Sequence, residues 1–182
     1  MEVYMSKLYI VRHGKTEWNE KGLLQGSNDI SLNEEGIKQA QELASKLDLS
    51  KIDVCISSPL IRAKQTAEIL VGNKLKIIYD DLLKERGFGN YEGKKINFEL
   101  IDKHWDYGLN DSHNGIESIK DCLDRAKIFL DKIKKQYPNK NILIVSHFAF
   151  IKALYYNING YDKNTNFTSF RPENATLYEF NI

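Results

Sequence analysis

The chain has 182 residues, of which 42% are hydrophobic and 28% charged, and its formal net charge is +1. This size and composition are typical of a globular protein with one hydrophobic core. The balance of 26 basic and 25 acidic residues argues against a protein that binds nucleic acid or a membrane surface through bulk charge. A local basic pocket remains compatible with it, because net charge does not report clustering.

The two cysteines and the lengths of the apolar runs indicate the compartment in which the protein is expected. Cys55 lies in an apolar run and Cys122 on the apolar face of a helical pattern, so both are predicted to be small buried hydrophobes. Residues 1–10 lack the basic and long apolar regions of a secretion signal. No apolar run approaches the roughly 20 residues that span a membrane. We therefore expect a cytoplasmic protein without a membrane partner.

Short apolar runs alternate with amphipathic helical patterns along the chain. In chain order we expect a strand at 7–11, a helix at 31–49, a strand at 52–57, a helix at 59–70, a strand at 75–79, a helix at 118–135, a strand at 141–146, a helix at 148–156 and an edge strand at 175–182. This alternation predicts an α/β fold, a three-layer sandwich with a largely parallel central sheet and helices on both faces. Residues 1–182 are expected to form a single domain.

Local signals indicate where the helices begin and which faces they bury. Ser31 and Asn33 are cap-type residues followed by acids, and Pro59 is expected in the first turn of its helix, where proline is tolerated. The apolar face of the helix at 31–49 is expected to comprise Ile37, Ala40, Leu43, Ala44 and Leu47. That of the helix at 118–135 comprises Ile119, Cys122, Leu123, Ala126, Phe129, Leu130 and Ile133.

Charged or titratable side chains follow four of the predicted strands. They are Arg12 and His13 after the first strand, Arg62 in the helix after the second, Glu85 after the third, and His147 after the strand at 141–146. Ligands of open α/β sheets bind beyond the carboxyl ends of the strands. We therefore expect these side chains to meet in one site.

The residue types at these strand ends suit phosphoryl chemistry. Two guanidinium groups and a second imidazole match the oxygens of a dianionic phosphoryl group. Neutral His13 is a candidate nucleophile towards phosphorus, and Glu85 is a candidate proton donor to the leaving oxygen. The sequence has no GxxxxGK[ST] phosphate loop and no clustered Asp pair or HxH motif for two metals. A covalent mechanism through histidine, with no metal and no cofactor, is the expectation that remains.

Five segments follow one another in the order of known family motifs. They are "VRHGKTEWN" (11–19), "LLQGSNDISLNEEGIKQA" (23–40), "SSPLIRAKQTA" (57–67), "KERGFGNYEG" (84–93) and "VSHF" (145–148). In that order they resemble the Arg-His-Gly motif, the Gln-Gly segment, the second arginine motif, the acid segment and the second histidine motif of the histidine phosphatase superfamily, also called the phosphoglycerate mutase-like family. The segment "NGIES" (114–118) is a looser match. The resemblance covers nearly the whole chain.

The resemblance implies a catalytic core of five residues. Arg12, Arg62 and His147 would hold phosphoryl oxygens around His13. His13 would become phosphohistidine. Glu85 would act as an acid towards the leaving oxygen and then as a base towards the incoming water or hydroxyl.

The resemblance also implies residues that line the substrate site. These are Asn19, Gln25 and Gly26, with Thr16 as a further candidate for contact with the phosphate. Gly14 is expected to let the backbone turn without a side chain that obstructs the phosphate oxygens. Phe148 stands where glycine is commoner, which raises the question of backbone freedom there or of a narrower pocket wall.

Three functions remain open for such a core. Mutases of the family carry a longer basic insertion after the acid segment, whereas here residues 94–116 form only a short cap-like segment without paired arginines. This favours a metal-independent phosphatase that acts on a small phosphorylated metabolite. The alternatives are a cofactor-dependent phosphoglycerate mutase and a non-catalytic phosphoester-binding module. The sequence indicates neither the particular substrate nor the oligomeric state.

Protonation states give a further expectation. His13 must be neutral to attack, whereas His147 and Glu85 are expected to work protonated, which predicts a bell-shaped pH profile centred on mildly acidic to neutral pH. His104 and His113 are expected to be exposed to solvent.

Overall fold

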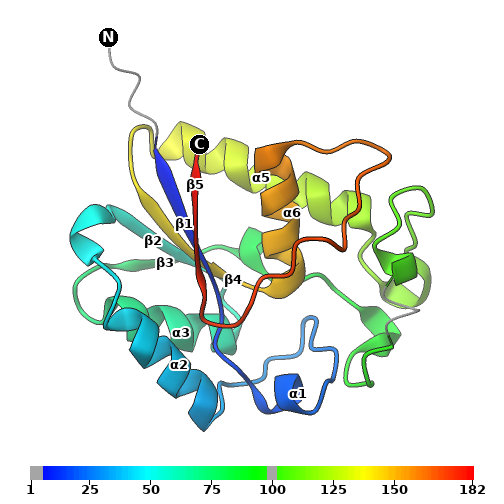
Figure 1. Cartoon of the computed structure of the whole chain (residues 1–182), viewed down its shortest axis with the longest axis horizontal. Helices are drawn as coiled ribbons and strands as arrows, with labels where there is room; N and C mark the ends of the chain where they lie inside the picture. The colour runs from blue at the N-terminus through cyan, green and yellow to red at the C-terminus, as the bar shows by residue number, and fades with distance from the viewer. Residues whose placement is uncertain (1–5, 98–101) are drawn as a thin grey trace.

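The strands form the largely parallel sheet that the sequence predicts. The computed structural model describes residues 6–97 and 102–182, in which five strands pair in the order β3-β2-β4-β1-β5 (Figure 1). Their bounds are β1 Lys7–Arg12, β2 Val54–Ser57, β3 Ile77–Tyr79, β4 Ile142–Ser146 and β5 Leu177–Asn181. The β1–β4, β2–β4 and β2–β3 pairs are parallel, and β5 is an antiparallel edge strand beside β1.

Helices cover both faces of the sheet, as predicted. The α-helices are α1 Glu17–Glu20, α2 Glu34–Ala44, α3 Ile61–Val71, α5 Ile119–Gln136 and α6 Phe148–Asn159, and the 3₁₀ helices are η1 Leu49–Lys51, η2 Asp81–Leu83, η3 Gly89–Tyr91 and η4 His113–Gly115. Figure 1 shows α2 and α3 on one face and α5 and α6 on the other. Within the described ranges, no helix is both long enough and apolar enough to cross a bilayer.

Alternate residues of the strands supply two hydrophobic cores, because successive side chains point to opposite faces. Leu8, Ile10, Ile56, Ile142 and Ile144 pack with residues of α5 and α6. Tyr9, Val11, Cys55, Leu143 and Val145 pack with residues of α3, with α2 contributing partly buried side chains. Burial of strands on both faces is typical of parallel sheets and explains their continuous apolar runs. Cys55 and Cys122 are buried free thiols, as predicted.

Two helix beginnings were predicted with unequal success. Asn33 caps α2, since its Oδ1 accepts a hydrogen bond from Gly36 N at 2.8 Å. The placement of Pro59 in a first turn is wrong, because α3 begins only at Ile61. The Oδ1 atom of Asp29 accepts from Ile61 N at 2.6 Å, so a loop distant in sequence caps this helix.

The helix predicted at 31–49 is shorter and less buried than expected. It ends at Ala44, after which Asp48 begins the separate helix η1 by accepting a hydrogen bond from Ser50 N. Ala40 is fully buried, whereas Ile37 is 38% exposed. Ile37, the first residue of the predicted apolar face of this helix, therefore lies at the surface and not in the core.

The segment expected to be cap-like lies partly outside the described residues. Residues 98–101 of the range 94–116 are not described, and neither are residues 1–5 of the expected N-terminal region. Within the rest of the segment, His104 and Trp105 are buried and Trp105 belongs to the core that packs on α5 and α6. His113 is exposed, as expected, whereas the expectation of exposure for His104 is wrong.

Candidate active site

Two neighbouring parallel strands bring the arginine–histidine pair next to the second histidine. Arg12 at the end of β1 pairs in register with Ser146 at the end of β4. The backbone N–H of His13 donates to the carbonyl of Ser146 at 3.0 Å. The rings of His13 and His147 consequently lie 5.2 Å apart between centroids. The convergence that the strand ends predict is therefore present.

His13 is held in one tautomer. Its Nδ1 lies 2.7 Å from the carbonyl oxygen of Gly14, and because a carbonyl only accepts, Nδ1 carries the proton and Nε2 keeps its lone pair. Burial lowers the pKa of His13 well below its usual value, and the charges of Arg62 and Arg12 lower it further. The imidazole is thus neutral near pH 7, as a nucleophile must be.

Arg62 is a buried side chain whose hydrogen bonds reach two other segments of the chain. Its Nη1 donates to the carbonyl of Asn28 at 2.7 Å and its Nη2 donates to the carbonyl of Gly26 at 2.8 Å. Its Nε donates to Nδ1 of His147 at 3.1 Å. Arg62 therefore joins the loop that carries Gly26 to the strand end that carries His147, while keeping its own charge next to His13.

The hydrogen bond from Arg62 determines which ring nitrogen of neutral His147 carries the proton. Because Nδ1 of His147 accepts a hydrogen bond, the proton of the neutral ring lies on Nε2, which is 2.8 Å from Oγ of Ser58. Burial, followed by the charge of Arg62, lowers the pKa of His147 well below its usual value. This differs from the expectation of a protonated His147, because a ring beside a buried guanidinium is a neutral hydrogen-bond donor.

Arg12 adds a second positive charge near His13. Its Nη1 donates to the carbonyl of Pro172 at 3.0 Å, and its guanidinium lies 4.9 Å from the ring centroid of Phe148. Burial lowers the pKa of Arg12 to about 10, so the group stays charged at neutral pH. Its Nε is buried and has no hydrogen-bond partner within the described ranges.

Glu85 is held at the first turn of α6. One carboxylate oxygen, Oε1, accepts from the backbone N–H groups of Ala149 at 3.0 Å, Phe150 at 3.3 Å and Arg86 at 2.9 Å. The first N–H groups of a helix have no partner inside the helix, and Oε1 of Glu85 accepts from two of them. Glu85 lines the same cavity as His13, which leaves it within reach of a bound ligand.

A cavity of about 440 Å³ opens above these residues. Of the residues implied to line the substrate site, Asn19, Gln25 and Gly26 line it together with Arg12, His13 and Glu85. Thr16 lies elsewhere: it is fully buried and caps α1, accepting a hydrogen bond from Asn19 N at 3.2 Å. Arg62 and His147 are fully buried beside His13 rather than in the lining.

The structure gives other physical reasons for the residue types at positions 14 and 148 than the sequence suggests. A Cβ on Gly14 would collide with the carbonyl of Gly36, so Gly14 is required by the close approach of the β1 exit to α2. Phe148 begins α6 and is not among the residues with a positive φ, so glycine is not required there. Its ring lines the cavity and faces Arg12, which makes it a wall.

Arg171 and Asn174, which line the cavity, are not predicted from the sequence. Trp105, Arg171 and Asn174 line the cavity, and Asn174 Nδ2 donates to the carbonyl of His13 at 2.8 Å. Arg171 and Asn174 carry no motif and follow no predicted strand, so only the tertiary fold identifies them. Among the residues that the structure describes, no three His, Cys, Asp or Glu side chains gather where they could hold a metal ion.

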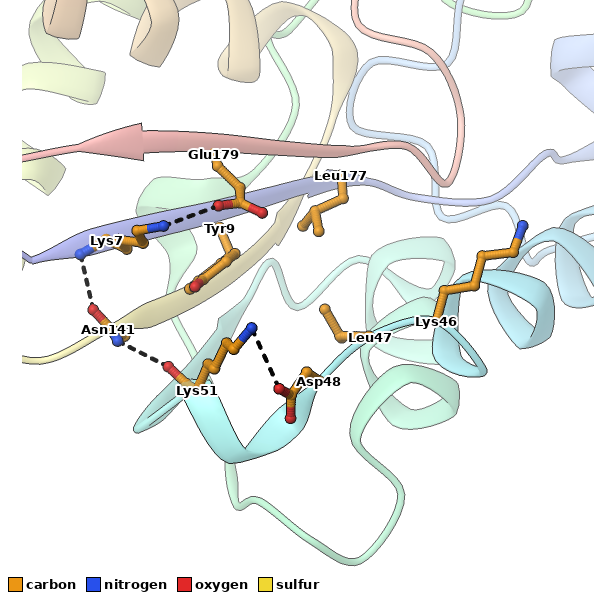
Figure 2. A pocket seen from close by; sticks show the side chains of 9 residues that line it. All are labelled: Lys7, Tyr9, Lys46, Leu47, Asp48, Lys51, Asn141, Leu177 and Glu179. Carbon is orange, nitrogen blue, oxygen red and sulfur yellow. Dashed lines mark hydrogen bonds and ion pairs between the residues drawn. The ribbon is translucent and has the colours of Figure 1, made fainter.

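A second cavity, of about 340 Å³, lies at the opposite ends of β1 and β4 (Figure 2). Its lining includes three lysines, but Lys7 pairs with Glu179 at 3.4 Å and Lys51 pairs with Asp48 at 3.5 Å. None of the strand-end residues described above lines this cavity.

Comparison with known proteins agrees with the strand-end geometry. The family model of the histidine phosphatase superfamily (branch 1) matches residues 8–182. The chain belongs to this superfamily. The resemblance of the five motifs is thereby confirmed.

Two bacterial relatives and one solved structure illustrate the similarity. This histidine phosphatase is similar to Phosphoserine phosphatase 1 of Hydrogenobacter thermophilus, with 35% identity over 94% of this chain and 84% of the relative. It is 38% identical to the uncharacterized phosphatase PhoE of Bacillus subtilis, over 87% of this chain and 80% of the relative. The crystal structure of phosphoserine phosphatase from Entamoeba histolytica, in complex with 3-phosphoglyceric acid, has a TM-score of 0.80 and 32% identity, and covers 97% of this chain and 90% of its own.

These similarities establish the fold and the class of enzyme. The solved structure shares the α/β architecture, so the predicted fold class is confirmed. The relatives are phosphatases, and the chain is accordingly an enzyme that hydrolyses phosphomonoesters.

Proposed function

We propose that this histidine phosphatase hydrolyses small phosphomonoesters in two steps through a phosphohistidine on His13. In the first step Nε2 of His13 forms a bond to phosphorus while the bond to the leaving oxygen breaks, and Glu85 gives that oxygen its proton. In the second step water attacks phosphorus, the P–N bond breaks, and Glu85 takes a proton from the water. Inorganic phosphate leaves, and His13 and Glu85 return to their initial states.

The observation that carries this proposal is the state of His13. Its Nδ1 proton is engaged by the carbonyl of Gly14, its pKa is lowered well below the usual value, and the residue lines a cavity that Arg12 and Arg171 also line. A buried imidazole with these properties is a nucleophile at neutral pH. A histidine that served only packing would not require two guanidinium groups beside it.

The charge of the transferred phosphoryl group is met by three side chains. Arg12 and Arg62 are the two largest electrostatic influences on His13, and His147, whose ring lies 5.2 Å away, would turn its Nε2–H from Oγ of Ser58 to a phosphoryl oxygen when substrate binds. Preorganised donors of this kind stabilise developing charge more strongly in a buried site than in water. The same cations supply the charge that a metal ion supplies in other phosphatases, so we propose that the reaction needs no metal.

The substrate class is proposed from the cavity and the relatives together. A cavity of about 440 Å³ suits a metabolite of a few carbon atoms rather than a macromolecule. Two of the three proteins compared above are named as phosphoserine phosphatases, and one of these was crystallised with 3-phosphoglyceric acid. We therefore place phosphorylated serine and phosphoglycerates first among the compounds to test. Asn19, Gln25 and Gly26 are proposed to contact the substrate, and Thr16 to act through Asn19.

Phosphorus NMR on the purified enzyme in excess EDTA tests the proposal. The sample contains 3-phosphoglycerate with a trace of 2,3-bisphosphoglycerate. A growing signal of inorganic phosphate is the expected result. Formation of 2-phosphoglycerate without inorganic phosphate would instead identify a mutase. Binding of 3-phosphoglycerate without any turnover would identify a phosphoester-binding module.

A further inference from the structure

A lysine of α6 lies buried against the aromatic wall of the cavity. Lys152 is 2% exposed, and its Nζ is 3.7 Å from the ring centroid of Trp105 and 5.2 Å from that of Phe148. Both rings line the cavity that contains His13. No hydrogen bond or ion pair reaches Nζ from residues 6–97 or 102–182. A buried ammonium group without an anionic partner is costly and needs a reason.

A second unpaired cation lies beside the same ring. Arg86 is fully buried, and its Nε donates to the carbonyl of Glu117 at 2.7 Å. Its Nη1 and Nη2 have no hydrogen-bond partner within the described part of the chain, and its guanidinium lies 5.0 Å from the ring centroid of Trp105. Contacts with an aromatic face offset only part of the cost of burying two cations.

Three carboxylates whose charges act on Arg86 are engaged elsewhere. Glu85 accepts from the backbone N–H groups of α6, and Glu117 pairs with Arg125 at 2.7 Å. Asp111 is 2.6 Å from His113 and 3.1 Å from His104. Asp102 raises the pKa of Lys152 as well. Even so, within the described ranges no carboxylate forms an ion pair with Lys152 or Arg86.

Arg171 extends this positive region into the cavity. It lines the cavity itself, and after burial its charge is the largest influence that lowers the pKa of Lys152, to about 7. Arg86 also lowers that pKa, whereas Glu85 and Asp102 raise it. An anion bound between Lys152 and Arg171 would relieve the repulsion between them.

We propose that Lys152 and Arg171 form a second anion site, which binds a carboxylate on the leaving group of the substrate where Trp105 and Phe148 wall the cavity. This inference rests on the proposed function and narrows its substrate class to phosphomonoesters that carry a carboxylate. His13 and its arginines hold the phosphoryl end, and the second site holds the carboxylate. The rings of Trp105 and Phe148 beside Lys152 are apolar surroundings in which the electrostatic attraction is stronger than in water.

A pair of substrates that differ at one group tests the proposal. 3-Phosphoglycerate and glycerol 3-phosphate differ in a carboxylate against a hydroxymethyl group. We expect the wild-type enzyme to prefer 3-phosphoglycerate in kcat/KM by at least tenfold. In Lys152→Met, which keeps the length of the side chain and removes its charge, this preference should collapse at least tenfold, mainly through a higher KM for 3-phosphoglycerate.

Two further variants keep the test decisive. Arg171→Gln changes an exposed residue and should lower the same preference, so it carries the test if Lys152→Met fails to fold. Lys120→Met is the matched control. Lys120 also lies over an aromatic ring, with its Nζ 4.7 Å from the centroid of Tyr107, but Tyr107 does not line the cavity. It should leave the preference unchanged.

The outcomes separate this inference from the proposed function. Equal use of both substrates by the wild type, or an equal loss on both in Lys152→Met and Arg171→Gln, would overturn the second anion site alone. Failure of the wild type to hydrolyse 3-phosphoglycerate, glycerol 3-phosphate and p-nitrophenyl phosphate would overturn the proposed function as well.

Discussion

Arg62 Nε donates a hydrogen bond to His147 Nδ1 over 3.1 Å, and this single contact places the proton of the neutral His147 ring on Nε2. The arginine thus acts in two ways at once, as a charge beside His13 and as the group that orients a second donor. A lysine could supply the charge but not the planar set of donors that reaches Asn28, Gly26 and His147 together.

Replacement of Arg62 by lysine should therefore lower kcat/KM by about 10²- to 10³-fold, the usual effect of removing a preorganised donor. Steady-state kinetics with p-nitrophenyl phosphate measure the effect, and circular dichroism checks the fold. The ¹⁵N chemical shifts of His147 should show loss of the single tautomer. Activity near the wild-type value in the folded variant would contradict the role given to Arg62.

Glu85→Gln should discriminate between leaving groups. The amide can still accept from the N–H groups of α6 but cannot transfer the proton in the same way. We expect kcat to fall about 10²- to 10⁴-fold for alkyl phosphates, whose alkoxide needs a proton. For p-nitrophenyl phosphate, whose leaving group is stable as an anion, the loss should be at least tenfold smaller. Equal losses on both substrates would assign Glu85 a structural role.

The pH profile should differ from the one that ordinary histidines would give. His13 must be neutral to attack, and its pKa is lowered well below 6.5 by burial and by Arg62 and Arg12. The acid limb of kcat/KM, which reports the free enzyme, should therefore lie below pH 6.5. Two substrates with different phosphate pKa values distinguish this limb from titration of the substrate. A limb at pH 6.5 or above that belongs to the enzyme would contradict the electrostatics of the site.

Lys152→Met should stabilise the protein while it impairs substrate selection. In the folded chain the pKa of Lys152 is lowered to about 7 by burial, Arg171 and Arg86, against the opposing effects of Glu85 and Asp102. Because the unfolded lysine binds its proton more tightly, burial costs most below pH 7, and the cost disappears as the pH rises towards the unfolded value of about 10.4.

We expect the variant to gain about 1–2 kcal/mol at pH 6.5, or a few degrees in Tm, with a smaller gain at pH 9.5. Thermal unfolding of both proteins at the two pH values measures this. A variant that is less stable than the wild type at pH 6.5 would show that Lys152 contributes to packing instead.

The sequence predicted those parts of the molecule that local patterns determine. Apolar runs locate strands, and residues that follow parallel strands reach one edge of the sheet, which is why the sequence predicts that Arg12, His13, Glu85 and His147 share one site. Pro59 was misplaced because a cap from Asp29, distant in sequence, decides where α3 begins.

The remaining features depend on tertiary contacts that no local pattern encodes. The tautomers of both histidines follow from hydrogen bonds to Gly14 and Arg62. Lys152 falls on a helix whose sequence is otherwise apolar, and Arg171 lies in a loop, so their approach to each other follows only from how α6 and the final loop pack. His104 was expected at the surface because polar residues usually lie there, yet it is buried beside Tyr91.

The central claim is the covalent intermediate on His13. Rapid-quench experiments with a ³²P-labelled phosphomonoester, in excess EDTA, test it most directly. The account predicts a burst of protein-bound label that is stable to alkali, labile to acid and located on His13, and that is absent from His13→Ala. Full turnover by the wild type without labelled protein, or label on another residue, would contradict it.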